Sequence, residues 1–214
     1  MIKRLFLLLV LAQFSGCASV QYKAMEKVGV HKRDILINKI ESARDSQAET
    51  KIQVVSTYEQ FKNLVMVNDG GLEKRYKAMA KAVERSQDRA TELDHRIDAV
   101  ESVAGDLFSE WKSELGQYSS AALREASAKN LLTTRSRYDV LVRRMRTAQS
   151  RVTPVLHVLQ DHTLYLKHNL NARAVSSLQS EVAAIESKVG ALVSDMEVAI
   201  TEAEKFIQGM NTGH

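Results

Sequence analysis

Residues 72–111, LEKRYKAMAKAVERSQDRATELDHRIDAVESVAGDLFSEW, decide the fold class. Small or apolar side chains recur along this stretch at alternating steps of four and three residues: Leu72, Tyr76, Met79, Val83, Ser86, Ala90, Leu93, Ile97, Val100, Ala104, Leu107 and Trp111. The mean step is about 3.5 residues, the repeat of a coiled-coil helix, whereas a strand returns to one face every second residue. The stretch therefore predicts one long helix with a narrow apolar seam.

The same spacing recurs in three further segments. The first carries Leu36, Ile40, Ala43, Val54, Phe61 and Leu64, with Gln47, Thr50 and Thr57 filling the same register. The third carries Tyr138, Leu141, Met145, Ala148, Val152, Val155 and Leu159, and the fourth carries Val175, Leu178, Val182, Ile185, Val189, Leu192, Met196, Ala199, Ala203 and Phe206. The pattern predicts four long helices and no sheet.

The segments are separated by short breaks. Asn68–Gly71, Gly116–Ser120 and His168–Asn171 contain the residues that turns favour, so the predicted helices lie near 20–68, 72–117, 120–169 and 172–209. The only proline, Pro154, is expected to kink the third helix without ending it, since the apolar series continues beyond it. Short connections make neighbouring helices antiparallel. The predicted fold is all-α, an elongated up-down-up-down four-helix coiled-coil bundle.

The N-terminal sequence has the features of an export signal. Lys3 and Arg4 precede the uncharged run LFLLLVLA, which is followed by small residues. Ser15-Gly16-Cys17 resembles the lipobox of bacterial lipoproteins, although Phe14 stands where such boxes usually carry leucine. The predicted organisation is a signal peptide over 1–16, a lipidated N-terminus and tether over 17–21, the bundle over 22–209 and a flexible C-terminus over 210–214.

The lipobox resemblance implies a membrane-lipid attachment through an acylated Cys17. Ala18, which is not aspartate, follows the cysteine, and this implies delivery to the outer membrane of a bacterial cell envelope, facing the periplasm. The alternative is an ordinary signal peptide cut near Ala18, which leaves Cys17 as a spare residue. Because Cys17 is the only cysteine, a disulfide role does not explain it.

No motif in the sequence supports catalysis. The six histidines form no HExxH pair, and no serine lies in a GxSxG setting. We therefore expect no enzymatic activity, no metal and no cofactor. Nucleic acid is also an unexpected partner, since the chain carries an export signal and the predicted mature protein is close to neutral.

Charge is distributed unevenly along the helices. Residues 120–170 carry nine Lys or Arg against three acids, and residues 172–214 carry three against six. One interpretation is pairing between neighbouring helices. The other is a basic face that binds anionic lipid, lipopolysaccharide or another acidic polymer, with candidate contacts Arg135, Arg137, Arg143, Arg144, Arg146 and Arg151.

The end of the bundle away from the anchor is a second candidate surface. Its apolar residues are Met66, Val67, Leu72, Tyr165, Leu166 and Leu170. Some of them must close the core, and the others could dock an envelope protein partner. Self-association through an exposed seam is a further possibility. The functional hypothesis is an anchored scaffold, spacer or protein-interaction module, with the anionic binding module as the alternative.

Several stretches resemble a bacterial family known only as domain of unknown function 2959. They are YKAMEKVGVHKRDILINKIESARDSQ at 22–47, LFSEWKSEL at 107–115, PVLHVLQDHTLYLKHNLNARAVSSL at 154–178 and EAEKFI at 202–207. The resemblance covers nearly all of the predicted mature chain and implies an envelope lipoprotein of coiled-coil helices. It implies no activity, cofactor or catalytic residue.

Overall fold

The computed structural model describes residues 31–66 and 71–212, and these contain helices and no strand. The long helices are α2 (Lys32–Met66), α3 (Leu72–Glu114), α4 (Ala121–Ser150), α5 (Val152–His168) and α7 (Val182–Asn211). The shorter elements are the 3₁₀ turn η2 (Leu115–Gln117), helix α6 (Ala172–Ser177) and the 3₁₀ turn η3 (Gln179–Glu181). The all-α prediction is confirmed.

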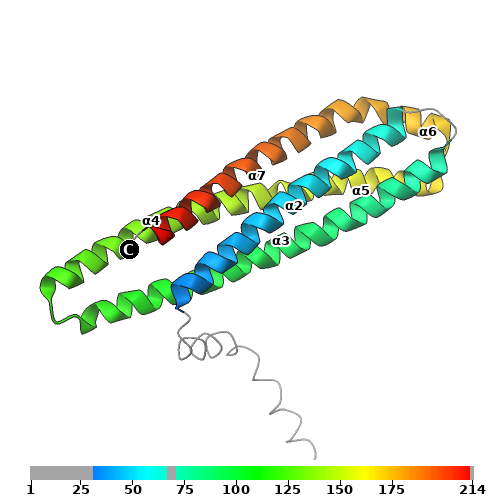
Figure 1. Ribbon diagram of the computed structural model, residues 1–214. Coiled ribbons are helices and arrows are strands. Elements are labelled where there is room, and N and C mark those ends of the chain that lie inside the picture. The colour runs from blue at the N-terminus through cyan, green and yellow to red at the C-terminus, as the bar shows by residue number, and fades with distance from the viewer. Residues whose placement is uncertain (1–30, 67–70, 213–214) are drawn as a thin grey trace, which may run out of the picture.

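The helices run side by side in alternating directions and form an elongated rod (Figure 1). Helix α2 packs against α3 and α7, and α4 packs against the same two helices from the other side. Helices α4 and α5 together form the third member of the bundle, after which the chain turns through α6 into α7. The predicted up-down-up-down four-helix architecture is confirmed. At about 1.5 Å per residue, the 43 residues of α3 span roughly 65 Å.

The predicted seam of α3 is its buried face through the middle of the rod. Seven central seam residues are at most 4 % exposed, namely Met79, Val83, Ser86, Leu93, Ile97, Val100 and Ala104, while Ala90 among them is partly buried. At the two ends, Leu72, Tyr76, Leu107 and Trp111 are only partly buried. The four-helix core therefore fades toward both ends of α3.

Pro154 interrupts the third helix without ending it, as predicted. Helix α4 ends at Ser150 and α5 begins at Val152, while Arg151 between them keeps helical angles of φ −81° and ψ −16°. A proline clashes with the carbonyl four residues before it, here that of Ser150, and lacks an N–H. The disturbance is confined to one turn because the apolar residues on both sides, Ala148 and Val155, are buried in the same core.

The fourth predicted helix is divided. The sequence predicted one helix over 172–209, whereas the structure has α6, η3 and then α7. Ser177 Oγ donates to the carbonyl of Ala174 at 2.7 Å, and the N–H of Leu178 donates to carbonyls only two and three residues back. Such local bonds compete with the regular helical ladder, so the backbone tightens into a 3₁₀ turn there.

Candidate functional site: the basic face and the two ends of the bundle

Arg146 on α4 is held by three carboxylates of α3. Its Nη1 donates to Asp94 Oδ1 at 2.7 Å, its Nε donates to Glu101 Oε1 at 3.0 Å, and it also pairs with Asp98. The hydrogen bonds to Glu101, and then those to Asp98, raise the pKa of Arg146 above its ordinary value. This guanidinium therefore ties α4 to α3, and its donors are directed into the bundle.

Three other candidate arginines also contact neighbouring helices. Arg151 pairs with Asp195 of α7, and the Arg135 guanidinium lies 5.7 Å from the ring centroid of Phe108 on α3. Arg137 packs against the last turn of α7, where a Cβ built on Gly209 would lie 3.1 Å from Arg137 Nη1. Arg135, Arg137 and Arg151 remain exposed side chains.

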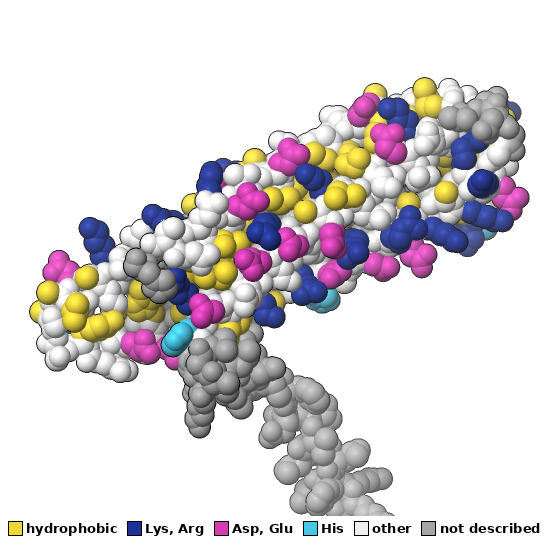
Figure 2. Space-filling model, viewed as in Figure 1, with side chains coloured by type: hydrophobic (Ala, Val, Ile, Leu, Met, Phe, Trp, Pro, Cys, Tyr) yellow, Lys and Arg dark blue, Asp and Glu magenta, His cyan; other side chains and the backbone are white. Residues whose placement is uncertain are grey.

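Arg143 and Arg144 are arranged differently. Both are exposed, and neither forms an ion pair with any residue of the described chain. On the face shown in Figure 2, acidic and basic side chains are interspersed along the middle of the rod. Of the six candidate contacts, Arg143 and Arg144 are the two that are exposed and have no interaction with a neighbouring helix within the described residues.

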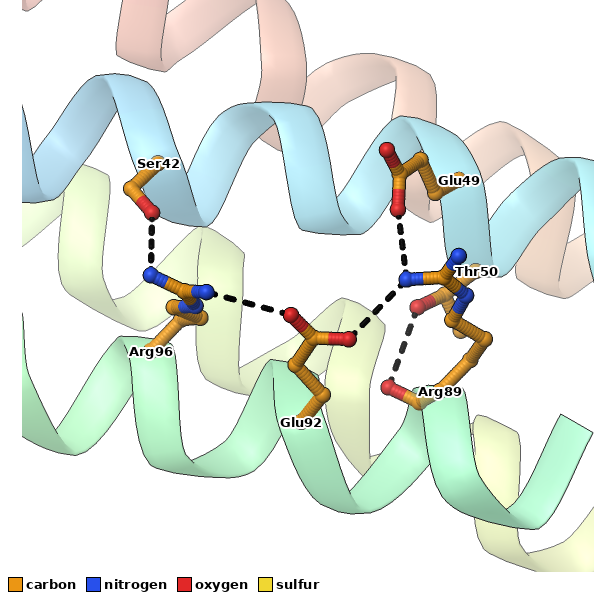
Figure 3. A network of polar contacts seen from close by, with 6 residues as sticks. All are labelled: Ser42, Glu49, Thr50, Arg89, Glu92 and Arg96. Atoms are coloured by element: carbon orange, nitrogen blue, oxygen red, sulfur yellow. Dashed lines mark hydrogen bonds and ion pairs between the residues drawn. The ribbon is translucent and has the colours of Figure 1, made fainter.

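A polar network joins α2 to α3 (Figure 3). Arg89 pairs with Glu49 at 2.7 Å and with Glu92 at 2.9 Å, and Arg96 donates to Ser42 Oγ at 2.8 Å and pairs with Glu92 at 3.1 Å. Hydrogen bonds from Arg96 and then Arg89 lower the pKa of the Glu92 carboxyl. These contacts fix the level at which α2 lies beside α3.

The α2–α3 seam also contains buried polar side chains. Gln47, Thr50, Thr57 and Ser86 are fully buried. Thr57 Oγ1 donates to the carbonyl of Ala82 at 3.1 Å, while neither amide atom of Gln47 has a hydrogen-bond partner. These side chains do not titrate in the ordinary pH range, and they are packed between two helices, so the seam has the properties of a packing element rather than of a reactive site.

At the distal end, the structure separates core residues from surface residues. Leu166 is fully buried, and Leu72 and Leu170 pack partly buried against the core. Met66 is 59 % exposed and Tyr165 is 44 % exposed. Val67 lies outside the described residues.

Leu164 precedes Tyr165 on α5 and is 58 % exposed, so it belongs to the same distal surface. Nearby, the ring of His162 stacks on Phe61 with centroids 5.4 Å apart, and burial lowers the pKa of His162.

The opposite end is not closed by four helices. Lys32, the first residue of α2, pairs with Glu110 of α3 at 2.6 Å, so α2 begins level with Glu110. Helix α7 ends beside Arg137. Of the described helices, α3 and α4 alone continue beyond these levels, as a two-helix hairpin over residues 111–134 (Figure 1). An up-down-up-down bundle of four equal helices would bring the C-terminus beside the 116–120 turn, but α7 stops short of it.

A cavity of about 570 Å³ opens where the hairpin leaves the bundle. It is lined by Arg33, Leu107, Glu110, Trp111, Glu114, Tyr118, Asn130, Thr133, Thr134, Arg137, Gly209 and Met210. The indole Nε1 of Trp111 donates to Ser127 Oγ at 2.8 Å, which joins the two arms of the hairpin. Hydrophobic side chains reach the surface at this end (Figure 2).

Two classes of site do not occur in the described part of the chain. Its histidines, aspartates and glutamates form no group that could hold a metal ion. Within 31–66 and 71–212, no helix combines the length and the apolar character that crossing a bilayer requires. Cys17 lies outside the described residues.

The sequence matches a family model described as Protein of unknown function (DUF2959) over residues 21–210. The chain belongs to this family. The DUF2959 match includes all four members of the bundle and the hairpin, and it begins ten residues before the first described one. Neither a search of curated proteins nor a search of solved structures found a match.

Proposed function

We propose that this DUF2959 protein is a lipid-anchored component of the bacterial cell envelope that acts as a scaffold, spacer or protein-interaction module without catalytic activity. The observation that carries the proposal is the separation of the two ends of the rod. The described part of α2 begins at Lys32, on the side of the sequence that contains Cys17, and Met66 is at the other end of this 35-residue helix. At about 1.5 Å per residue, this distance is roughly 50 Å.

The anchor is the part of the proposal that defines one end as membrane-proximal. The Ser15-Gly16-Cys17 sequence behind an uncharged apolar run supports it. Two or three acyl chains would hold the protein stably, because each buried CH₂ contributes about 0.8 kcal/mol. The chain would then extend from the membrane as a rod with an apolar far end.

Mass spectrometry of the mature N-terminus, purified from membrane fractions, tests the anchor. We expect an acylated Cys17 in the wild type and loss of membrane association in Cys17→Ser. An unmodified N-terminus near Ser19 would contradict the anchor, and the protein would then be a bundle without membrane attachment.

The interaction role is tested at the exposed distal residues. A photo-crosslinking amino acid at Tyr165 or Leu164 is expected to capture a discrete partner in intact cells. The same amino acid at Ile52, which is 66 % exposed in the middle of α2, is the matched control. Equal products from the control position would contradict a docking role for the distal end.

One observation favours the alternative, a module that binds anionic lipid or lipopolysaccharide. Arg143 and Arg144 are adjacent, exposed and unpaired within the described chain. The double variant Arg143→Gln/Arg144→Gln is expected to bind anionic vesicles more weakly than the wild type does, with a reduced dependence on salt. Lys74→Gln/Lys81→Gln on α3 removes the same charge from another face, and an equal loss in that control would exclude a specific basic site.

A further inference from the structure

His162 on α5 packs against α2 near the distal end of the bundle. Its imidazole ring stacks on the ring of Phe61, with the two centroids 5.4 Å apart and the ring planes inclined by 14°. Phe61 is fully buried, so this stack lies at the edge of the hydrophobic core. The Nε2 atom of His162 is buried and has no hydrogen-bond partner within the described chain. The ring is therefore held as an aromatic group, with one nitrogen that meets no acceptor.

The charged groups around His162 act on it only from a distance. Asp161 precedes it on α5 and Glu181 lies at the end of η3, but neither forms an ion pair with it in the described part of the chain. Both carboxylates belong to exposed residues. The charged and titratable side chains that the neighbouring elements place at or near this level are Tyr58 and Lys62 on α2, Arg75 and Lys81 on α3, Asp161 on α5, Glu181 on η3 and Glu186 on α7.

Protonation makes the stacked position unfavourable for His162. A protonated imidazole carries a positive charge and an N–H on each ring nitrogen. In the stack, the Nε2–H would be buried without an acceptor, and burying an unpaired charge is costly. Because Asp161 and Glu181 are exposed, the charged ring reaches a carboxylate or water only by leaving Phe61. Acid therefore favours an arrangement in which the stack is broken.

The segment that carries His162 lies between two irregular points of the backbone. Helix α5 begins two residues before Pro154, whose missing N–H leaves one helical hydrogen bond unmade. Beyond the end of α5, the chain passes through α6 into the 3₁₀ turn η3. This turn is joined to α2 by a hydrogen bond in which Gln179 Nε2 donates to the carbonyl of Val65 at 3.3 Å. Such irregular points absorb backbone rotations, so α5 can tilt at its distal end while α4 and α7 stay in place.

We propose that His162 is an acid-sensitive switch that controls the distal surface of the bundle. At neutral pH its stack on Phe61 holds the last two turns of α5 against α2. Protonation of His162 breaks the stack, and α5 tilts away from α2 at its distal end. The opening uncovers Phe61 and Leu166, both of which are fully buried in the closed form. These side chains then join the exposed Leu164 and Tyr165 in one apolar surface.

The consequence for partner binding rests on the proposed function, in which the distal end docks an envelope protein. Removal of apolar area from water is the dominant favourable contribution in most protein–protein association. A distal surface enlarged by Phe61 and Leu166 therefore binds an apolar partner surface more tightly in acid than at neutral pH. The switch itself requires no partner, because it depends on contacts within the bundle.

Spin-label distances test the switch in the full chain carrying Cys17→Ser, which removes the only native cysteine. Nitroxide labels are attached at Asn63→Cys on α2 and Leu164→Cys on α5, two exposed and uncharged positions. At pH 7.5 we expect one distance between the labels, and at pH 5.5 we expect a second, longer distance to appear. The matched control pair is Asn38→Cys on α2 with Ser136→Cys on α4, two exposed positions away from the distal end. It is expected to keep one distance at both pH values.

Two histidine variants assign the response to one side chain. His162→Phe keeps an aromatic ring against Phe61 but has no nitrogen to protonate. We expect this variant to show the single short distance at both pH values, and the wild-type distance at pH 7.5 shows that it folds correctly. His157→Gln removes an exposed histidine from the same helix and is expected to keep the acid response.

Three results would overturn the proposal. A single distance in the wild type at pH 5.5 would show that protonation opens nothing. Opening of His162→Phe in acid would assign the response to another group. Equal lengthening in the control pair would show that acid loosens the whole bundle rather than its distal end. Because the labels report the opening without a partner, these results concern the switch alone, whereas crosslinking at Tyr165 tests the docking role separately.

Discussion

The side-chain oxygens of Thr57 and Ser86 lie 2.7 Å apart in the fully buried seam between α2 and α3. Thr57 also donates to the carbonyl of Ala82 and accepts from the amide of Gln53. A coiled-coil seam ordinarily places apolar side chains at these positions. The hydrogen bonds of these two hydroxyls therefore help to fix the register of α2 against α3.

Thr57→Val keeps the shape of the side chain but leaves the Ser86 hydroxyl without its cross-helix partner. An unsatisfied buried polar group costs about 1–3 kcal/mol, so we expect a loss of that size in the free energy of unfolding by urea. The double variant Thr57→Val/Ser86→Ala is expected to recover part of it, because no hydroxyl is then left unpaired. A double variant less stable than the single one would contradict this account.

Gln47→Leu is expected to stabilise the bundle. Both amide atoms of Gln47 are buried without a partner, so the wild type carries their desolvation penalty. The expected gain is about 1–3 kcal/mol in the free energy of unfolding, measured by urea titration. The control is Gln208→Leu, at an exposed position on α7, which is expected to change stability little. Destabilisation by Gln47→Leu would show that the amide is satisfied in solution, for example by a buried water.

Arg146→Met removes the cation that three carboxylates of α3 share. We expect a loss of about 1–2 kcal/mol in the free energy of unfolding, which decreases as salt is added, because partly exposed ion pairs contribute about 0.2–1 kcal/mol each. Arg143→Met is the matched control, since its neighbouring guanidinium forms no ion pair within the described chain. Equal effects of the two variants would mean that the α3 carboxylates contribute nothing through Arg146.

His162 gives the stability a dependence on pH near neutrality. Burial lowers the pKa of His162 below its ordinary value of about 6.5, despite the opposing effects of Glu181 and Asp161. The folded state therefore binds fewer protons here than the unfolded state, and stability falls as the pH decreases below about 6.5.

We expect the melting temperature of the wild type to decrease between pH 7.5 and pH 5.5 more than that of His162→Gln does. His157→Gln changes an exposed histidine on the same helix and is expected to follow the wild type. If His162→Gln keeps the full pH dependence, the titrating group is elsewhere.

The four-helix fold could be predicted because one seam is repeated in every segment with few breaks. The division near Leu178 could not, since it depends on where the Ser177 hydroxyl finds an acceptor, and a sequence pattern does not encode that choice. The contacts of Arg146 left a readable signal: Asp94, Asp98 and Glu101 recur at steps of four and three beside the α3 seam. Such a row of acidic residues along one side of a helix predicts that a neighbouring helix places a basic side chain beside it.

The candidate surfaces were predicted less completely. Composition identified the basic third helix. Which of its arginines form ion pairs with α3 or α7 depends on the register of α4 against those two helices, and composition does not give that register. The cavity beside Trp111 was missed for a related reason. Helix lengths can be read from a seam, whereas the level at which α2 and α7 stop beside α3 is set by tertiary contacts such as Lys32–Glu110 and Arg137–Gly209.

The hairpin over 111–134 is built from residues that are contiguous in sequence, and most of the α4 arm is exposed. The length of this hairpin is therefore not constrained by the packing of the four-helix part. Seven residues added to each arm, in phase with the heptad, would move the turn outward by about 10 Å while every buried contact of the four-helix part stayed in place. Paired insertions at Gly116–Ser120 would therefore change the length of the rod without changing its four-helix core.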